Sequence, residues 1–159
     1  MDRMNIPPAL QATLAAVAAM AAAAEHPWWL IGSAAVALHG ADVAVADVDL
    51  LTSAGDARRI LATAGVTAAP GDRTERFHSQ VFGRIRGLPL ELEIMADFSV
   101  CTGGTWRPVV PATREAVMAG DATLYVPGKA ELQSLLRLIG RPKDLLRAAL
   151  LDQTHGRPS

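Results

Sequence analysis

The fold is decided by residues 28–51, which read WWLIGSAAVALHGADVAVADVDLL. Four apolar residues run into the pair Gly32-Ser33, an alanine-rich segment follows, and two carboxylates then alternate with large aliphatic residues. This order predicts a strand, a tight turn, a short helix over residues 33–39 and a second strand over residues 43–51. The glycine allows close approach of the backbone, and the first helical amides point toward the turn, so the turn is a candidate anion site.

Two carboxylates lie on one face of the second strand. Because side chains alternate along a strand, Asp47 and Asp49 point to one face while Val48 and Leu50 point to the other. Adjacent carboxylates repel each other unless a cation lies between them, and oxygen ligands at this spacing suit Mg²⁺ bound together with a polyphosphate. The pair alone is also compatible with a strand that has one solvated face, as in many antiparallel sheets.

The order and spacing of these features resemble the signature of the polymerase-β-type nucleotidyltransferases. The matching residues are Gly32 and Ser33, thirteen intervening residues, and the acidic segment 47–49. The long spacing is similar to the branch that contains antibiotic nucleotidyltransferases and AbiEii/MenT-like toxins. The resemblance implies that Asp47 and Asp49 bind Mg²⁺ and act in catalysis, and that Gly32 and Ser33 hold the phosphates of a nucleoside triphosphate.

The resemblance also implies a third carboxylate and a basic segment. Residues 88–95, LPLELEIM, supply two candidate metal ligands, of which Glu93 is the better match and Glu91 is the alternative. Residues 140–144, GRPKD, are similar to an Arg-x-Lys-Asp segment found at a helix start in related enzymes. Arg141 and Lys143 are therefore expected to bind the triphosphate or the acceptor, Arg through paired hydrogen bonds and Lys as a point charge.

The chain departs from the family pattern in three respects. Ser33 stands where the AbiEii-like branch often has a second glycine. Glu93 replaces the commoner aspartate, which moves the carboxylate outward by one methylene group. The large C-terminal helical domain, which usually binds the acceptor, is missing, so the acceptor stays open.

Composition and charge narrow the protein class. The chain has 159 residues, half of them apolar, and a formal net charge of −1, which indicates a globular protein without a global basic field. Cys101 is the only cysteine, so an internal disulfide is excluded and a reducing, cytoplasmic location is expected. The alanine-rich run at residues 10–24 is interpreted as a packed helix and not as a signal peptide or a membrane span. Apolar surface on this helix would support a homodimer.

We expect an α/β (α+β) nucleotidyltransferase fold, with a mixed β-sheet flanked by helices and a short C-terminal helical extension. The predicted divisions are a core at residues 1–127, a two-helix extension at 128–152 and a disordered tail at 153–159. Other predicted elements are listed by residue range: helices at 8–25, 56–64, 113–118, 129–139 and 141–152, a hairpin from 81–86 and 88–95, a loop at 97–108, and a strand at 122–126.

The predicted reaction is Mg²⁺-dependent transfer of a nucleoside monophosphate from a nucleoside triphosphate to a hydroxyl group. The acceptor is a small molecule such as an antibiotic, a tRNA end or a protein, and a toxin–antitoxin role is conceivable. The alternative is a non-catalytic module of the same fold that binds a nucleotide or a partner protein. A third alternative is an accidental match in an unrelated α+β domain, which predicts that Gly32 and the Asp47/Asp49 pair lie far apart.

Overall fold

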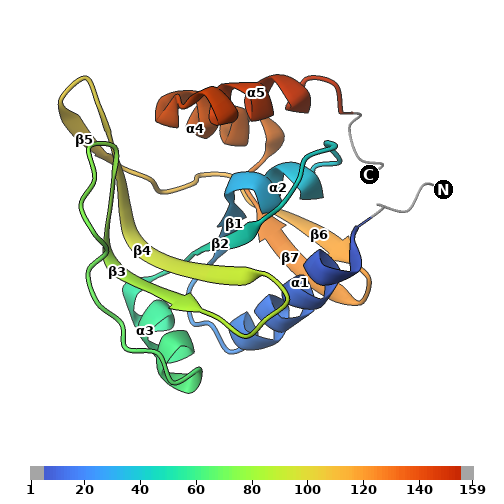
Figure 1. The fold of residues 1–159 in the computed structure, drawn as a ribbon, viewed down its shortest axis with the longest axis vertical. Coiled ribbons are helices and arrows are strands. Elements are labelled where there is room, and N and C mark those ends of the chain that lie inside the picture. Colours follow the sequence, from blue (N-terminus) through green and yellow to red (C-terminus); the bar gives the residue numbers. More distant parts are fainter. Residues whose placement is uncertain (1–5, 155–159) are drawn as a thin grey trace.

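The computed structural model describes residues 6–154, in which twelve helices and strands follow one another along the chain (Figure 1). The helices are α1 (Pro8–Ala21), α2 (Gly32–Leu38), α3 (Ala54–Thr63), α4 (Lys129–Ile139) and α5 (Pro142–Leu151). The strands are β1 (Trp29–Ile31), β2 (Asp47–Leu51), β3 (Phe77–Ile85), β4 (Glu91–Thr102), β5 (Thr105–Pro108), β6 (Glu115–Ala119) and β7 (Ala122–Val126). This alternation confirms the predicted mixed α+β class.

The main sheet is mixed, as predicted. Its strand order is β1-β2-β4-β3, and β5 pairs with the far part of β4. β2 and β4 run parallel, whereas β1 is antiparallel to β2 and β3 is antiparallel to β4. β6 and β7 form a separate hairpin, and α4 and α5 lie together across one side of the fold, opposite β3 and β4 (Figure 1).

The core holds β2 and β4 in one fixed register. The inward face of these strands contributes Val48, Leu50, Leu92 and Ile94, each with no exposed surface. A shift by one residue would turn these four side chains out of the core, so the apolar face fixes the pairing of the polar face. In the observed register Asp47 is opposite Glu91 and Asp49 is opposite Glu93.

α1 packs against the sheet and the β6–β7 hairpin through one face. Leu10, Leu14, Val17 and Ala21 are buried there, which confirms a packed helix. The helix ends at Ala21, four residues before the predicted end. No helix among the described residues is long and apolar enough to cross a membrane. The homodimer stays a prediction.

β4 continues through a segment that we expected to be a loop. The prediction for residues 97–108 is wrong, because β4 extends to Thr102 and returns as β5. Asp97 has φ +51 and is the only residue other than glycine with a positive φ within residues 6–154. The long β3–β4 pair bends upward toward α4, as Figure 1 shows.

Two further element predictions need correction. Residues 113–118 do not form a helix, because residues 115–119 are β6, which pairs with β7 through a two-residue turn at Gly120-Asp121. Gly120 has φ +59, a conformation that favours glycine and suits a tight hairpin turn. The tail prediction falls mostly on residues 155–159, outside the described residues, whereas Gln153 and Thr154 donate backbone hydrogen bonds to Leu150 and Leu151.

Substitution of Asp97 tests the bend in β4. We expect Asp97→Val to lower the free energy of unfolding by about 1–2 kcal/mol, because a β-branched residue is strained in the left-handed region. Asp97→Gly and Asp97→Asn should leave the stability within about 0.5 kcal/mol of the wild type, since both residues tolerate this region. Urea unfolding of the three variants measures these differences, and equal losses in all three would contradict the assignment of strain.

Candidate active-site cleft

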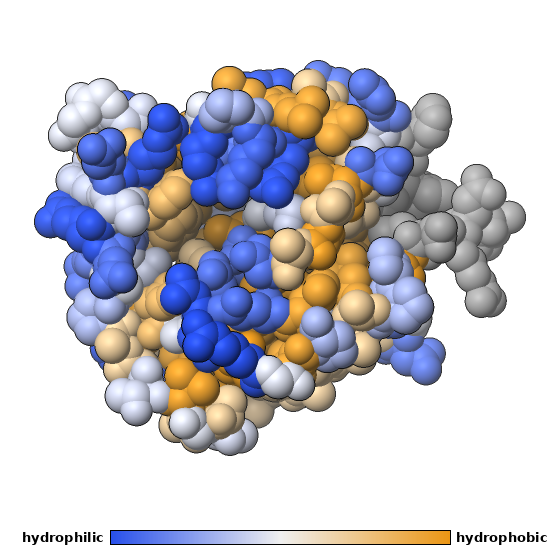
Figure 2. Space-filling view, in the orientation of Figure 1, coloured by the Kyte–Doolittle hydropathy of each residue, from blue (hydrophilic) through white to orange (hydrophobic). Residues whose placement is uncertain are grey.

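The polar face of β2 and β4 forms one wall of a cleft of about 580 Å³. α4 and α5 form the opposite wall, and β3 with the loop that precedes it closes one end. Figure 2 shows hydrophilic side chains across the middle of this face, with hydrophobic residues next to them. Of the predicted site residues, Gly32, Asp47, Asp49, Glu93, Arg141 and Lys143 all line the cleft.

The register of the two parallel strands brings the three predicted carboxylates together. Asp47 and Asp49 project from β2, and Glu93 lies opposite Asp49 on β4. The side chains of Asp49 and Glu93 interact, and this interaction contributes to a raised pKa of Asp49. Two neighbouring carboxylates retain a proton between them or take up a cation.

Burial and charge repulsion raise the pKa of both aspartates. The pKa of Asp49 is well above its usual value, first because the group is desolvated and then because of the hydrogen bond with Glu93 and the charges of Glu93 and Asp47. The pKa of Asp47 is raised by burial and by the charges of Glu93 and Glu91, while Lys143 and Arg147 lower it. The cleft therefore concentrates negative charge where water is partly excluded, which is typical of a functional site.

Gly32 forms the turn that brings β1 against this acidic face. Its φ is +67, and a Cβ atom at this position would lie 2.5 Å from Oδ2 of Asp49. A side chain at residue 32 would thus displace the carboxylate. Ser33, by contrast, is only 4% exposed and is not among the residues that line the cleft, so its contact with phosphate stays a prediction.

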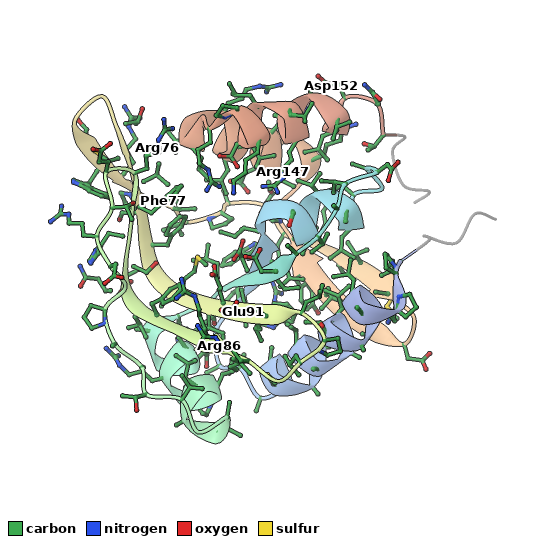
Figure 3. The ribbon with its side chains drawn as sticks, viewed as in Figure 1. Arg76, Phe77, Arg86, Glu91, Arg147 and Asp152 are labelled. Atoms are coloured by element: carbon green, nitrogen blue, oxygen red, sulfur yellow. The ribbon has the colours of Figure 1, made fainter. Side chains whose placement is uncertain are left out.

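Four cationic side chains line the cleft around the carboxylates: Arg84, Arg141, Lys143 and Arg147. Arg147 extends from α5 toward the side that faces β2 (Figure 3). Asp144, 1% exposed, accepts hydrogen bonds from Nε of Arg141 at 2.6 Å and from Nη2 of Arg141 at 3.1 Å, and its Oδ1 lies 3.8 Å from Nη1 of Arg147. The segment 140–144 thus starts a helix, as predicted, and its buried aspartate orients two guanidinium groups.

Arg84 connects the two candidate third carboxylates. Its Nε lies 3.2 Å from Oε1 of Glu93 and 3.3 Å from Oε1 of Glu91. Glu91 also faces Arg86 at 3.7 Å, beside the end of the β3–β4 hairpin (Figure 3), and it does not line the cleft. Of the two candidates, Glu93 is therefore the one placed to act in the cleft.

The donor set suits Mg²⁺ that arrives with a phosphate ligand. Within residues 6–154, no three or more His, Cys, Asp or Glu side chains are arranged to hold a metal ion by themselves. Mg²⁺, however, commonly binds through one or two carboxylates while substrate phosphates and water supply the remaining ligands. Burial and the neighbouring carboxylates raise the pKa values of Asp47 and Asp49, and Glu93 is opposite Asp49 in the sheet. The residues present fit such a partial coordination.

Two of the four cationic residues of the cleft, Arg84 and Arg147, are not among the site residues predicted from the sequence. Arg147 is four residues after Lys143, and this spacing places both on one face of α5. Arg84 comes from β3, and the pairing of β3 with β4 places it opposite Glu93. The helix spacing could have identified Arg147, whereas Arg84 required the register of β3.

Comparisons with known proteins show the fold of this chain. No protein-family profile matches the sequence, and no curated protein matches it. Among solved structures, the chain is similar to a candidate nucleotidyltransferase from Thermotoga maritima, with 24% identity, coverage of 93% of each chain and a TM-score of 0.70.

Two antibiotic-modifying proteins share the same architecture. ANT(2")-Ia in complex with adenylyl-2"-tobramycin is 12% identical, with coverage of 90% of this chain and 88% of that chain and a TM-score of 0.57. The lincosamide antibiotic adenylyltransferase LnuA, bound to lincomycin, is 14% identical, with coverage of 86% and 92% and a TM-score of 0.54. The chain thus has the nucleotidyltransferase fold, and the acidic pair lies at its cleft next to the Gly32 turn.

Replacement of Gly32 tests the close approach to Asp49. We expect Gly32→Ala to destabilise the protein by about 1–2 kcal/mol through its positive φ, and in addition to push the Asp49 carboxylate out of position. Gly40→Ala is the matched control, because Gly40 has φ +96 but open space around a Cβ atom. Thermal unfolding and nucleotide titration of both variants separate the two effects. Equal nucleotide binding in both would contradict a role for the turn.

Neutralising Asp49 should stabilise the folded protein. The folded protein holds the Asp49 proton more tightly than the unfolded chain does. The protonated carboxyl therefore contributes its full stabilisation below a pH of about 3.8, and this stabilisation is lost as the pH rises through the raised pKa. Asp49→Asn should therefore raise Tm by about 2–4 °C at pH 7–8. The advantage should shrink as the pH falls toward 4. Calorimetric scans across this pH range measure the Tm difference between the variant and the wild type. A lower Tm for the variant at pH 8 would contradict the destabilisation of the folded protein by the charged Asp49 carboxylate.

Proposed function

We propose that this protein is a nucleotidyltransferase that moves a nucleoside monophosphate from a Mg²⁺-bound nucleoside triphosphate to a hydroxyl acceptor. The observation that carries the proposal is the convergence of Asp47, Asp49 and Glu93 on one cleft wall, with the cations of α5 across from them. The shared fold with antibiotic adenylyltransferases supports the same chemistry.

The carboxylates and the cations of the cleft have different roles in the proposed reaction. Asp47, Asp49 and Glu93 would hold Mg²⁺, which would supply charge neutralisation at the phosphates when bound. Lys143 and Arg147 line the cleft from α5, and their positive charges oppose the rise in the pKa of Asp47 that burial and the neighbouring glutamates cause. Gly32 leaves room for the Asp49 carboxylate close to the backbone, because a side chain at residue 32 would displace it.

The transfer needs little covalent participation by the protein. The acceptor oxygen forms a bond to the α-phosphorus, the bond from this phosphorus to the bridging oxygen breaks, and pyrophosphate leaves. Glu93 takes the proton of the hydroxyl group. Positioning of the two reactants and stabilisation of charge then provide most of the rate enhancement.

The acceptor belongs to one of three classes: a small molecule, a tRNA end or a protein. ANT(2")-Ia is bound to an adenylylated tobramycin and LnuA to lincomycin, which favours a small molecule. The single cysteine favours a cytoplasmic location for the reaction.

A non-catalytic module of the same fold is the second candidate function. The ion pair between Arg84 and Glu93 favours it, because a cation of the protein already compensates the third carboxylate. Such a module would bind a nucleotide or a partner without a need for Asp47 and Asp49.

Calorimetric titration separates the two candidates. The four nucleoside triphosphates are titrated with and without Mg²⁺ into the wild type, Asp47→Asn/Asp49→Asn and the control Asp121→Asn, which lies in the exposed turn between β6 and β7. We expect Mg²⁺-dependent binding of at least one nucleotide, unchanged in the control and weakened about 100-fold or more in the double variant, as for the loss of a metal ligand set. Binding that is independent of Mg²⁺ and of both aspartates would favour the module.

A further inference from the structure

The cleft has a charged end and an apolar end, and the strand register sets their order. Arg84 is opposite Glu93, and one step further along the sheet Phe82 is opposite Met95. The next levels pair Ser79 with Phe98 and Phe77 with Val100. The wall therefore changes from carboxylates to large apolar side chains within a few residues of β4.

The bend at Asp97 makes this apolar end. Glu93 and Met95 line the cleft with the ordinary spacing of two, but the next lining residue of β4 is Phe98, three positions later. This change of phase coincides with the positive φ of Asp97. A local irregularity in a strand re-aims the following side chains, so Phe98 faces the cleft and not the opposite side of the sheet.

The apolar end is large and carries few charges. All three phenylalanines of the chain line the cleft, and this part of its lining is Phe77, Phe82, Met95, Phe98, Leu135 and Ile139. Phe77 and Phe98 stack with ring centroids 6.0 Å apart. The guanidinium of Arg141 lies 4.9 Å above the Phe77 ring and is paired with the buried carboxylate of Asp144, while Asp72 is an exposed carboxylate of the lining. This end would therefore offer a polycation one exposed acid, Asp72, because Asp144 is already engaged by Arg141.

Stereochemistry assigns this end to the acceptor. In a displacement at phosphorus, the entering and leaving oxygens lie on opposite sides of the phosphorus atom. Lys143 and Arg147 extend from α5 into the cleft, so the leaving pyrophosphate lies on their side. The acceptor then approaches from the other side, past Asp49 and Glu93, where the apolar end begins.

We infer that the apolar end binds the acceptor, and that this acceptor is a hydroxyl compound with an aromatic or aliphatic body and not a polycation. The inference rests on the proposed function and adds the chemical class of its second substrate. The acceptor oxygen bonds to the α-phosphorus, pyrophosphate leaves, and the hydroxyl proton passes to Glu93.

A matched pair of probes tests the inference. Phenyl β-D-glucoside and methyl β-D-glucoside carry the same sugar hydroxyls and differ in the aromatic ring, and tobramycin represents a polycation. Each is titrated into the protein with and without Mg²⁺ and a non-hydrolysable nucleotide analogue. The reporter is the ¹³C-labelled methyl group of Met95, assigned with Met95→Leu. We expect binding of the phenyl compound about tenfold tighter than that of the methyl compound, because the ring buries apolar area, and no shift with tobramycin.

Variants of Phe82 locate the effect. Phe82→Ala should weaken binding of the phenyl compound about tenfold, Phe82→Leu should restore part of it, and the exposed-site control Met118→Ala should change nothing. Circular dichroism confirms that each variant is folded.

Equal affinity for the two glucosides, or tobramycin binding at Met95, overturns the inference. An equal loss of nucleotide affinity in Phe82→Ala also overturns the inference, because it would place the nucleobase at the apolar end. Failure of every nucleotide to bind the wild type instead removes the proposed function, whatever the glucosides do.

Discussion

The parallel pairing of β2 with β4 is the constraint on which the rest of the site depends. Its inward side chains have no exposed surface, and they fix a register in which Asp47, Asp49, Glu91 and Glu93 share the outward face. The core therefore forces like charges together, at a cost that appears in the raised pKa values of both aspartates. Structures keep such repulsion where a bound cation removes it, which connects the fold directly to the chemistry of the cleft.

A second local feature, the bend at Asp97, decides what lies beside those carboxylates. A regular β4 would continue to present alternate residues to the cleft, whereas the change of phase brings Phe98 into the wall next to Met95. The same bend carries β5 and the start of β3 toward α4, where Arg76 donates a 2.7 Å hydrogen bond from Nη1 to the carbonyl of Ile139. One irregular residue thus shapes the apolar end of the cleft and brings it into contact with the wall formed by α4 and α5.

Local patterns in the sequence predicted much of this arrangement. The elements of residues 28–51 follow the predicted order, although the acidic strand begins at Asp47 and not at residue 43. The helix at 129–139 has the predicted bounds, because periodicity and caps act within a few residues. The predicted loop at 97–108 and helix at 113–118 are wrong, although the sequence carries signals for strands in both segments. Phe98 and Val100 alternate with polar residues before Gly103-Gly104, and Gly120-Asp121 is a hairpin turn. The partners of Arg84 depend on pairing between distant strands, which no local pattern encodes.

The cationic wall shows why α4 and α5 belong to the site as well as to the fold. Asp144 accepts from the backbone and side chain of Arg141 and so caps α5, while its other oxygen faces Arg147. The same buried carboxylate stabilises the helix start and orients two of the four cations of the cleft. Gln133 of α4 donates to the carbonyl of Ala148 and to Asp152, which holds the two helices together. A change that loosens this helix pair would therefore also move positive charge away from Asp47 and Asp49, and the repulsion between those aspartates would increase.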